Sequence, residues 1–469
     1  MADDRTEPTM LRLRAGLQGS DPEIWREVET GDWLTLAQLH DVLQIAFGWQ
    51  QAHLHRFSDE DPWASPGRGI PRIGRQPRAW VDQWSLLESG GEAGEADEAD
   101  ATLAEAFRDG GPLWYEYDLG DGWMHRIDLV ATRAAPPGTA PVRLVDGARR
   151  APFEDSGGLG GYAEKLAIMA DPGHPEHNEI LGWARSVAGP WGSIDPEQID
   201  LDGARADLEL LTGPATPDMS GLVDAARDID DDAPIVGFAA NLPVPYRANL
   251  RAHLRTSGVL DPVTLTDDEA AELVRPYHWL MERIGDDGLA LTAAGRLPPA
   301  LVRAAVAELD WGSLVYGQTD REDNTWPVHL LRTTAERLRL VRKVKGRLVL
   351  AARTRALRDD PQALCRQVAH VLLRQRMDEA QQLACTTFVL GIADGSISRQ
   401  DDGAALVFEI VNGFGYTDEQ GMPLDKRWYF ALTEPARSVL NTLGLRRSPL
   451  DASAAPSDAL RRFARLALR

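Results

Sequence analysis

Alternation of hydrophobic and polar residues over residues 10–17 and 24–28 predicts two half-buried strands near the start of the chain. Apolar side chains then recur at helical spacing over residues 36–46, directly after Thr35, whose hydroxyl suits a helix N-cap. Gly48 follows the last apolar turn, where a glycine commonly ends a helix in the left-handed conformation. The pattern therefore predicts a strand pair followed by a helix.

The clearest hairpin signal lies further along the chain. Residues 113–119 are rich in aromatic side chains, residues 120–122 read Gly-Asp-Gly and can make a tight turn, and residues 123–130 return as a second strand. A further strand is predicted at residues 53–57, and helices are predicted at residues 162–169, 176–187 and 201–211. Strands first and helices last, without regular alternation, predict an α+β fold for the first half.

The second half of the chain is expected to be built differently, because its periodic segments are mainly helical. We expect a domain over residues 1–212, an acidic linker with Pro and Gly over residues 213–232, and a mainly helical region over residues 233–469. Within that region a helix over residues 329–340 precedes a basic hairpin centred on Gly346. A helix, a hairpin and a further helix are the elements of a winged helix.

Charge and composition narrow the functional classes. The 469 residues carry a formal net charge of −22, which argues against a protein covered with nucleic acid but leaves room for one local basic face. Two cysteines, Cys365 and Cys385, are too few for a disulfide framework. No signal-peptide pattern or membrane-spanning apolar run is apparent, so we expect a cytoplasmic protein. The acidic run over residues 92–100 is expected to be a solvated loop.

The local basic face is predicted at residues 329–358. This segment is rich in arginine and lysine, and Glu336 is its one acidic residue. The candidate contacts to DNA phosphates are Arg342, Lys343, Lys345, Arg347, Arg353 and Arg355. Lysine and arginine on a protruding hairpin could grip the phosphate backbone. The alternative is that this face docks on a protein partner or on the acidic first half.

His53 and His55 form an HxH pair, and on one strand both imidazoles would project to the same face, about 7 Å apart. That spacing suits a divalent metal ion, with Asp118 as a third candidate ligand. The candidates for acid or base catalysis beside the metal are His125, Asp121, Glu154 and Asp155. Such a site would leave open positions for water, as a metal-dependent hydrolase needs. The alternative is structural: His55 bonds within an aromatic core, and Asp118 and Asp121 cap the hairpin turn.

Gly157 and Gly158 open a glycine-rich run in front of a predicted helix. The run lacks the Lys-Ser or Lys-Thr pair of a P-loop, and acidic residues precede it. A tight turn that lets the chain pack closely is favoured over a phosphate site.

Four ordered blocks of the first half resemble the plasmid pRiA4b open-reading-frame-three family. The residues that carry the resemblance are Trp25, Arg26, Phe47, Gly48, Trp49, Tyr117, Gly120, Gly157 and Gly158. The chain departs from the family pattern at Glu27 and Phe153, and it has Leu144, Ala151 and Ser156 where many members carry cysteines. A thiolate-bound metal is therefore not expected. The resemblance implies a largely uncharacterised, mobile-element-type protein and does not extend to the second half.

Two functions remain open from the sequence. One is a non-enzymatic binding module that contacts DNA or a protein partner through residues 329–358. The other is a metal-dependent hydrolase that uses the histidines and carboxylates of the first half. Bound metal would favour the second function, and salt-sensitive retention on DNA would favour the first.

Overall fold

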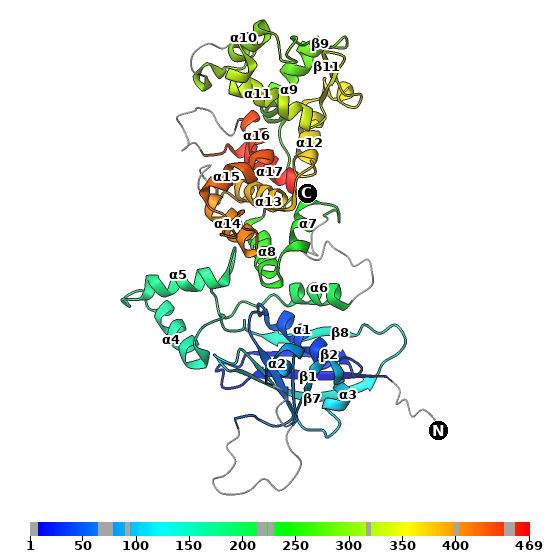
Figure 1. Cartoon of the computed structure of the whole chain (residues 1–469), viewed down its shortest axis with the longest axis vertical. Coiled ribbons are helices and arrows are strands. Elements are labelled where there is room, and N and C mark those ends of the chain that lie inside the picture. Colours follow the sequence, from blue (N-terminus) through cyan, green and yellow to red (C-terminus); the bar gives the residue numbers. More distant parts are fainter. Residues whose placement is uncertain are drawn as a thin grey trace. The chain divides into compact units, whose positions relative to one another are not determined.

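The computed structural model describes residues 8–63, 78–89, 94–212, 223, 229–315, 320–397, 403–444 and 455–469. The chain divides into two compact units, Met1–Val223 with Ala240–His253 and Asp224–Ala239 with Leu254–Arg469. Figure 1 shows the order of their elements by colour. The expected linker at residues 213–232 lies mostly outside the described residues. Its role as a boundary therefore stays a prediction.

The first unit is built on an eight-stranded sheet in the order β5-β4-β3-β6-β7-β1-β2-β8. Its strands are β1 (Thr9–Leu17), β2 (Trp25–Gly31), β3 (His55–Ser58), β4 (Ala79–Val81), β5 (Glu95–Asp97), β6 (Leu113–Tyr117), β7 (Trp123–Ala134) and β8 (Val142–Ala148). All neighbours pair antiparallel except β4 and β5, which are parallel. The predicted strand pair is β1 with β2, and the predicted hairpin is β6 with β7.

The helices of the first unit follow from local signals and from burial. They are α1 (Leu36–Phe47), α2 (Gln83–Ser89), α3 (Leu103–Ala106), α4 (Gly158–Ala170), α5 (His177–Ala188), α6 (Leu201–Thr212) and the start of α8 (Val244–Ser257). Thr35 caps α1 by accepting from the Gln38 backbone, and Gly48 ends it at φ 80°. The apolar face of α1 joins the sheet in one buried core. The predicted α+β class of this half is confirmed.

Arg26 ties the end of α1 to the sheet. It is 1% exposed and donates hydrogen bonds to the carbonyl oxygens of Trp25, Ala46 and Ala148. Its guanidinium also lies 4.7 Å from the ring centre of Phe47. Because the group is removed from water, burial lowers the pKa of Arg26 to about 9. One side chain thus satisfies carbonyl groups of three segments that would otherwise be buried without donors.

A buried ion network holds α8 against α6 within the first unit. Asp207 on α6 accepts from Arg247 Nη1 at 2.7 Å and from Arg251 Nη2 at 2.7 Å, and Asp200 accepts from Arg251 Nε at 3.0 Å. The Arg251 and Asp207 side chains are 0% and 1% exposed. Residues 240–253 therefore belong to the first unit, although the sequence places them in the helical region.

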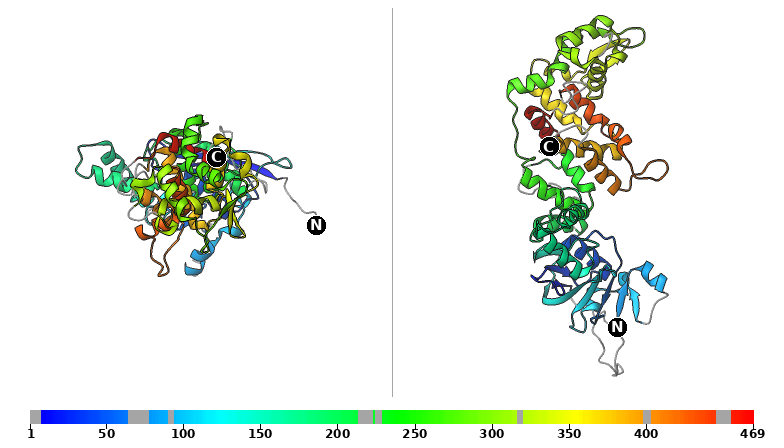
Figure 2. Two further views of the ribbon diagram at one scale, coloured as in Figure 1. Left: turned by 90° about the horizontal axis from the view of Figure 1, so that it is seen from above. Right: turned by 90° about the vertical axis from the view of Figure 1, so that its left-hand side faces the viewer.

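The second unit is mainly helical, as predicted, and its helices run from green to red in Figure 2. They are α7 (Pro234–Asn241), α9 (Asp267–Ile284), α10 (Pro299–Glu308), α11 (Trp326–Arg337), α12 (Pro361–Leu372), α13 (Glu379–Asp394), α14 (Gly403–Gly413), α15 (Lys426–Leu432), α16 (Glu434–Thr442) and α17 (Asp458–Leu468). A small sheet is ordered β10 (Val341–Val344), β11 (Arg347–Leu350) and β9 (Leu289–Ala290). α13 is buried on all sides from residue 383 to residue 393, which makes it the central helix of this unit.

The two cysteines pack in the core of the second unit. Cys365 and Cys385 are 1% and 0% exposed, and burial raises the pKa of each thiol to about 12. Neither forms a thiolate near neutral pH, which fits a packing role. Among the described residues, no helix is both long enough and apolar enough to cross a membrane.

We expect the substitution Asp207→Asn to destabilise the first unit by about 3–5 kcal/mol, because it leaves two buried guanidinium groups with too little negative charge. Urea unfolding followed by circular dichroism measures the change in stability. The control is Asp202→Asn on the same helix, whose exposed ion pair with Arg205 should contribute under about 1 kcal/mol. Equal destabilisation of the two variants would show that the buried network does not hold α8.

Candidate functional site

The site begins at the turn of the β6–β7 hairpin, where Asp118 has two roles. Its backbone is left-handed, at φ 55°, and its carbonyl accepts from the Gly122 N–H at 2.6 Å. Oδ1 accepts from the backbone N–H groups of Gly120 and Asp121 at 2.9 and 3.2 Å. Asp118 therefore caps the turn with one oxygen, while Oδ2 remains directed at His53.

Asp121 joins this turn to the segment in front of α4. Its Oδ2 accepts from the Gly157 N–H at 2.9 Å, so Asp121 does not cap the hairpin turn. A Cβ atom on Gly158 would lie 2.7 Å from the Asp121 carbonyl oxygen, and both glycines have positive φ, 82° and 67°. Only glycine fits such an approach without strain. The two glycines thus allow the turn and the Glu154–Asp155 segment to meet.

Three carboxylates converge on one imidazole at this meeting point. His53 Nε2 lies 3.6 Å from Asp118 Oδ2, 3.5 Å from Glu154 Oε2 and 3.6 Å from Asp155 Oδ1. His53 is 26% exposed and Asp155 is 73% exposed, whereas Asp118 and Glu154 are buried. Asp155 is a second non-glycine residue in the left-handed region, at φ 54°. We call these four side chains the His53 site.

Glu154 is the buried member of the His53 site. Its Oε1 accepts from the Gln50 backbone N–H at 2.8 Å and from the Tyr117 hydroxyl at 3.2 Å. Its Oε2 has no hydrogen-bond partner among the described residues and faces His53. Burial raises the pKa of the Glu154 carboxyl above its ordinary value. A buried oxygen without a donor is costly unless a proton or a cation reaches it.

The donor set of the His53 site suits a divalent cation. The ligand atoms of His53, Asp118 and Asp155 all lie within 4.8 Å of one another. Imidazole nitrogen with carboxylate oxygen is a ligand combination used for zinc, manganese and iron. With a cation present, an exposed rim would leave coordination positions open to water.

His55 lies elsewhere, because β3 begins at His55 and His53 precedes it. The strand alternation that would align the two imidazoles therefore does not apply. His55 Nε2 pairs with Glu98 Oε2 at 2.8 Å, and its ring stacks on His40 with 3.6 Å between ring centres. Glu98 is 5% exposed, so the acidic run that contains it is not simply a solvated loop. Nothing in the sequence distinguishes Glu98 from the other acidic residues of this run, so its burial could not be predicted.

His125 is fully buried in the aromatic core. Its ring contacts Phe47, Trp49 and Tyr115, and Nδ1 lies 3.3 Å from the Tyr115 carbonyl oxygen. No described carboxylate lies within ion-pairing distance of it, so the structure does not bring His125 to the His53 site. Burial lowers its pKa to about 4. It is a neutral core histidine at physiological pH.

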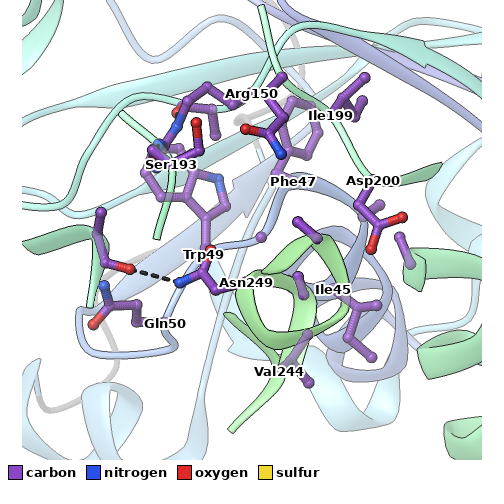
Figure 3. Close-up of a pocket in the computed structure, with 18 of the residues that line it drawn as sticks. Ile45, Phe47, Trp49, Gln50, Arg150, Ser193, Ile199, Asp200, Val244 and Asn249 are labelled. Carbon is purple, nitrogen blue, oxygen red and sulfur yellow. Dashed lines mark hydrogen bonds between the residues drawn. The ribbon is translucent and has the colours of Figure 1, made fainter. Parts of the chain in front are cut away.

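A cavity of about 130 Å³, which Glu154 also lines, lies between the end of α1, residues 150–154 and α8. Figure 3 shows Trp49 among the lining side chains, with Arg150 and Ser193 nearby. The Asn249 amide donates to the Ala188 carbonyl oxygen. The Trp49 Nε1–H group is buried without an acceptor among the described residues. Ordinary ligand pockets are roughly 300–1,000 Å³. This cavity suits water or a small polar group, and it is too small for an extended substrate.

The candidate DNA contacts of the second unit lie on the predicted hairpin and beyond it. Arg342, Lys343, Lys345 and Arg347 are exposed on β10, β11 and their turn. Lys343 lies 3.8 Å from Glu336, and Arg347 donates to the Asp287 and Gly288 carbonyl oxygens. Arg353 and Arg355 are exposed after the hairpin. The other basic residues of this stretch include buried Arg332, which pairs with Glu322.

Comparison with known proteins finds matches to both halves. The family described as "Plasmid pRiA4b ORF-3-like protein" matches residues 9–203, and the "Y4jL N-terminal domain" matches residues 269–363. The "Uncharacterized protein y4hQ" of Sinorhizobium fredii (strain NBRC 101917 / NGR234) is 34% identical over 205 residues, which are 43% of this chain and 89% of that protein. A crystal structure of the protein of unknown function MM3350 from Methanosarcina mazei Go1 is 25% identical, with a TM-score of 0.34, and the match covers 42% of this chain and 97% of that one.

The burial of His125 gives a pH dependence. The unfolded chain binds a proton at this imidazole below pH 6.5, whereas the folded chain does so only near pH 4. Stability is therefore complete above pH 6.5 and falls as the pH drops toward 4, by up to roughly 3 kcal/mol. Urea unfolding at several pH values should show a smaller decrease in His125→Gln than in the wild type. Parallel pH profiles for the two proteins would show that His125 is not the group responsible.

Proposed function

This chain belongs to the plasmid pRiA4b ORF-3-like family, and we propose that the domain carrying the family motifs binds a divalent metal ion at the His53 site. The observation that carries the proposal is the approach of three carboxylate oxygens to His53 Nε2 at 3.5–3.6 Å. His53, Asp118 and the Glu154–Asp155 pair come from three separate segments of the matched residues 9–203. Two of them, Asp118 and Asp155, hold strained left-handed backbones, which cluster at functional sites.

Hydrolysis is the chemistry that such a metal centre supports. A divalent ion lowers the pKa of a bound water and supplies hydroxide near neutral pH. Burial raises the pKa of Glu154. Its carboxylate lies beside the His53 imidazole and is positioned to take up a proton. The exposed rim at Asp155 gives a substrate access. The proposed reaction class is metal-assisted hydrolysis. His55 and His125 have structural roles in this proposal and take no part in the reaction.

Metal binding is tested on the purified full chain. We expect one Zn²⁺ or Mn²⁺ ion per chain by isothermal titration calorimetry, with affinity reduced by at least roughly tenfold in His53→Ala and in Asp118→Asn. Asp109→Asn, an exposed carboxylate of the same unit, is the control and should bind as the wild type does. If neither ion binds at millimolar concentration, or if the control loses as much affinity, the proposal is wrong.

The hydrolase step has its own readout. Chromogenic ester and phosphodiester substrates should be cleaved by the metal-loaded wild type, and chelation or the His53→Ala substitution should abolish this activity. Stoichiometric metal binding without turnover of any substrate would support a metal-binding domain and contradict the proposed hydrolase activity.

A second function, contact with the DNA backbone, is supported by the β10–β11 hairpin. Arg342 and Lys345 are exposed, and neither side chain forms an ion pair with a described residue. The tip residues Lys345 and Gly346 have φ values of 47° and 76°, as in a two-residue hairpin turn. Cations on a protruding hairpin between two helices suit a winged-helix-like contact to phosphates.

Alanine at Arg342, Lys343, Lys345 and Arg347 should weaken binding to all DNA duplexes alike. The slope of log affinity against log salt should become shallower by roughly one for each phosphate that the variant no longer neutralises. Fluorescence anisotropy over a salt series measures both quantities, and Arg303→Ala on α10 is the matched exposed control. Absence of binding by the wild type at low salt would exclude this function.

A further inference from the structure

The second unit contains a hollow of about 400 Å³ lined by five arginines. Its walls are the end of α11 with residues 338–340, the segment of Arg353, Thr354 and Leu357, and the second half of α12 with residues 374–376. The arginines are Arg337, Arg339, Arg353, Arg374 and Arg376. None of the 13 described residues that line it is acidic. In a chain with a net charge of −22, such a concentration of positive charge has to be explained.

Two of these arginines are already engaged. Arg337 forms a two-point ion pair with Glu434 at 3.0 and 3.1 Å. Arg374 donates to the carbonyl oxygens of His370, Asp232 and Arg469, and it lies 3.9 Å from the Asp232 carboxylate. These contacts fix the walls of the hollow rather than leave donors free for a ligand.

Three guanidinium groups remain available. Arg339, Arg353 and Arg376 are exposed, and their side chains make no hydrogen bond or ion pair with any described residue. The C-termini of α11 and α12 contribute about half a negative charge each, which does not balance three cations. The hollow therefore has a positive excess that an anionic ligand would neutralise.

The backbone at Arg339 supports a role for its side chain. Arg339 ends α11 in the left-handed region at φ 58°, and the Leu340 N–H bonds to the Ala335 carbonyl across it. Glycine is the usual residue at this position of a helix end, and another residue costs about 1 kcal/mol or more. Arg339 adopts this unfavourable backbone conformation, and its side chain lines the hollow.

Gln375 lines the hollow beside these arginines. It is 8% exposed, and its amide donates to the Leu372 and Pro435 carbonyl oxygens at 2.7 and 3.2 Å. Its Oε1 is buried without a hydrogen-bond partner among the described residues. Because this oxygen is closed off from solvent, Gln375 shapes the wall of the hollow through the two hydrogen bonds of its amide group.

We infer that the arginine hollow binds a phosphorylated sugar of the size of a nucleoside monophosphate. Arginine pairs with phosphate through two parallel hydrogen bonds, and the hollow is large enough to hold a sugar beside the phosphate. The volume falls in the roughly 300–1,000 Å³ range of small-molecule sites. The hollow shares no residue with the His53 site or with the β10–β11 hairpin.

The test is isothermal titration calorimetry of the full chain with AMP, ribose 5-phosphate, inorganic phosphate and adenosine. AMP or ribose 5-phosphate should bind more tightly than inorganic phosphate, and adenosine should not bind. Arg339→Gln, Arg353→Gln and Arg376→Gln should each weaken that binding by roughly tenfold or more. All three replace exposed side chains, and matching circular dichroism spectra verify that the variants fold.

The control is Arg342→Gln with Lys345→Gln, two exposed cations of the same basic region that do not line the hollow. It should bind AMP as the wild type does. Failure of all phosphorylated probes at millimolar concentration would overturn the inference. So would variants of the hollow that lose only duplex DNA binding, because the arginines would then serve the DNA backbone.

Discussion

The close approach of the hairpin turn to the Gly157–Gly158 pair is the contact on which the first unit's site depends. A Cβ atom at Gly158 would collide with the Asp121 carbonyl oxygen at 2.7 Å. Without a glycine there, the Glu154–Asp155 segment could not reach the turn that carries Asp118. His53 enters from a third segment, ahead of β3. These segments are far apart in the sequence, and they meet because Gly158 has no side chain to separate them and Gly157 takes the left-handed backbone in front of it.

Buried charge in this protein follows one rule, which is that a buried ionic group is either satisfied or is a candidate for binding. Arg26 gives its donors to three carbonyl oxygens, and Arg251 has Asp207 and Asp200. Glu154 Oε2 is buried without a hydrogen-bond partner, and the three guanidinium groups of the hollow, although exposed, also lack partners among the described residues. Because an unpaired buried oxygen or a group of unpaired cations is unfavourable, these two places are where a cation and an anion would stabilise the fold.

Local signals in the sequence predicted local structure well. Thr35 and Gly48 mark the ends of α1, and the Gly-Asp-Gly turn marks the β6–β7 hairpin. The site was predicted only in part. His53, Asp118, Glu154 and Asp155 could be named from their motifs, but His55 and His125 belong to the core. β3 begins at His55, so the alternation that would put His53 and His55 on one face does not extend to His53.

Interactions over long sequence distances were not predictable. The contact between Asp207 and Arg251 joins residues from opposite sides of the expected linker, and no periodicity encodes it. Glu98 becomes a buried partner of His55 only when the sheet forms. The arginine hollow likewise draws Arg374 and Arg376 from beyond the basic stretch visible in the sequence. Each depends on tertiary packing, which a single sequence does not display.

The most direct measurement is the anomalous diffraction of crystals grown with Mn²⁺. We predict a peak within about 2.0–2.3 Å of His53 Nε2 and of oxygens from Asp118 and Asp155, with Glu154 beside the ion rather than bound to it. A peak at another place in the first unit, or a direct hydrogen bond between His53 and Glu154 with no peak, would contradict a metal centre at the His53 site.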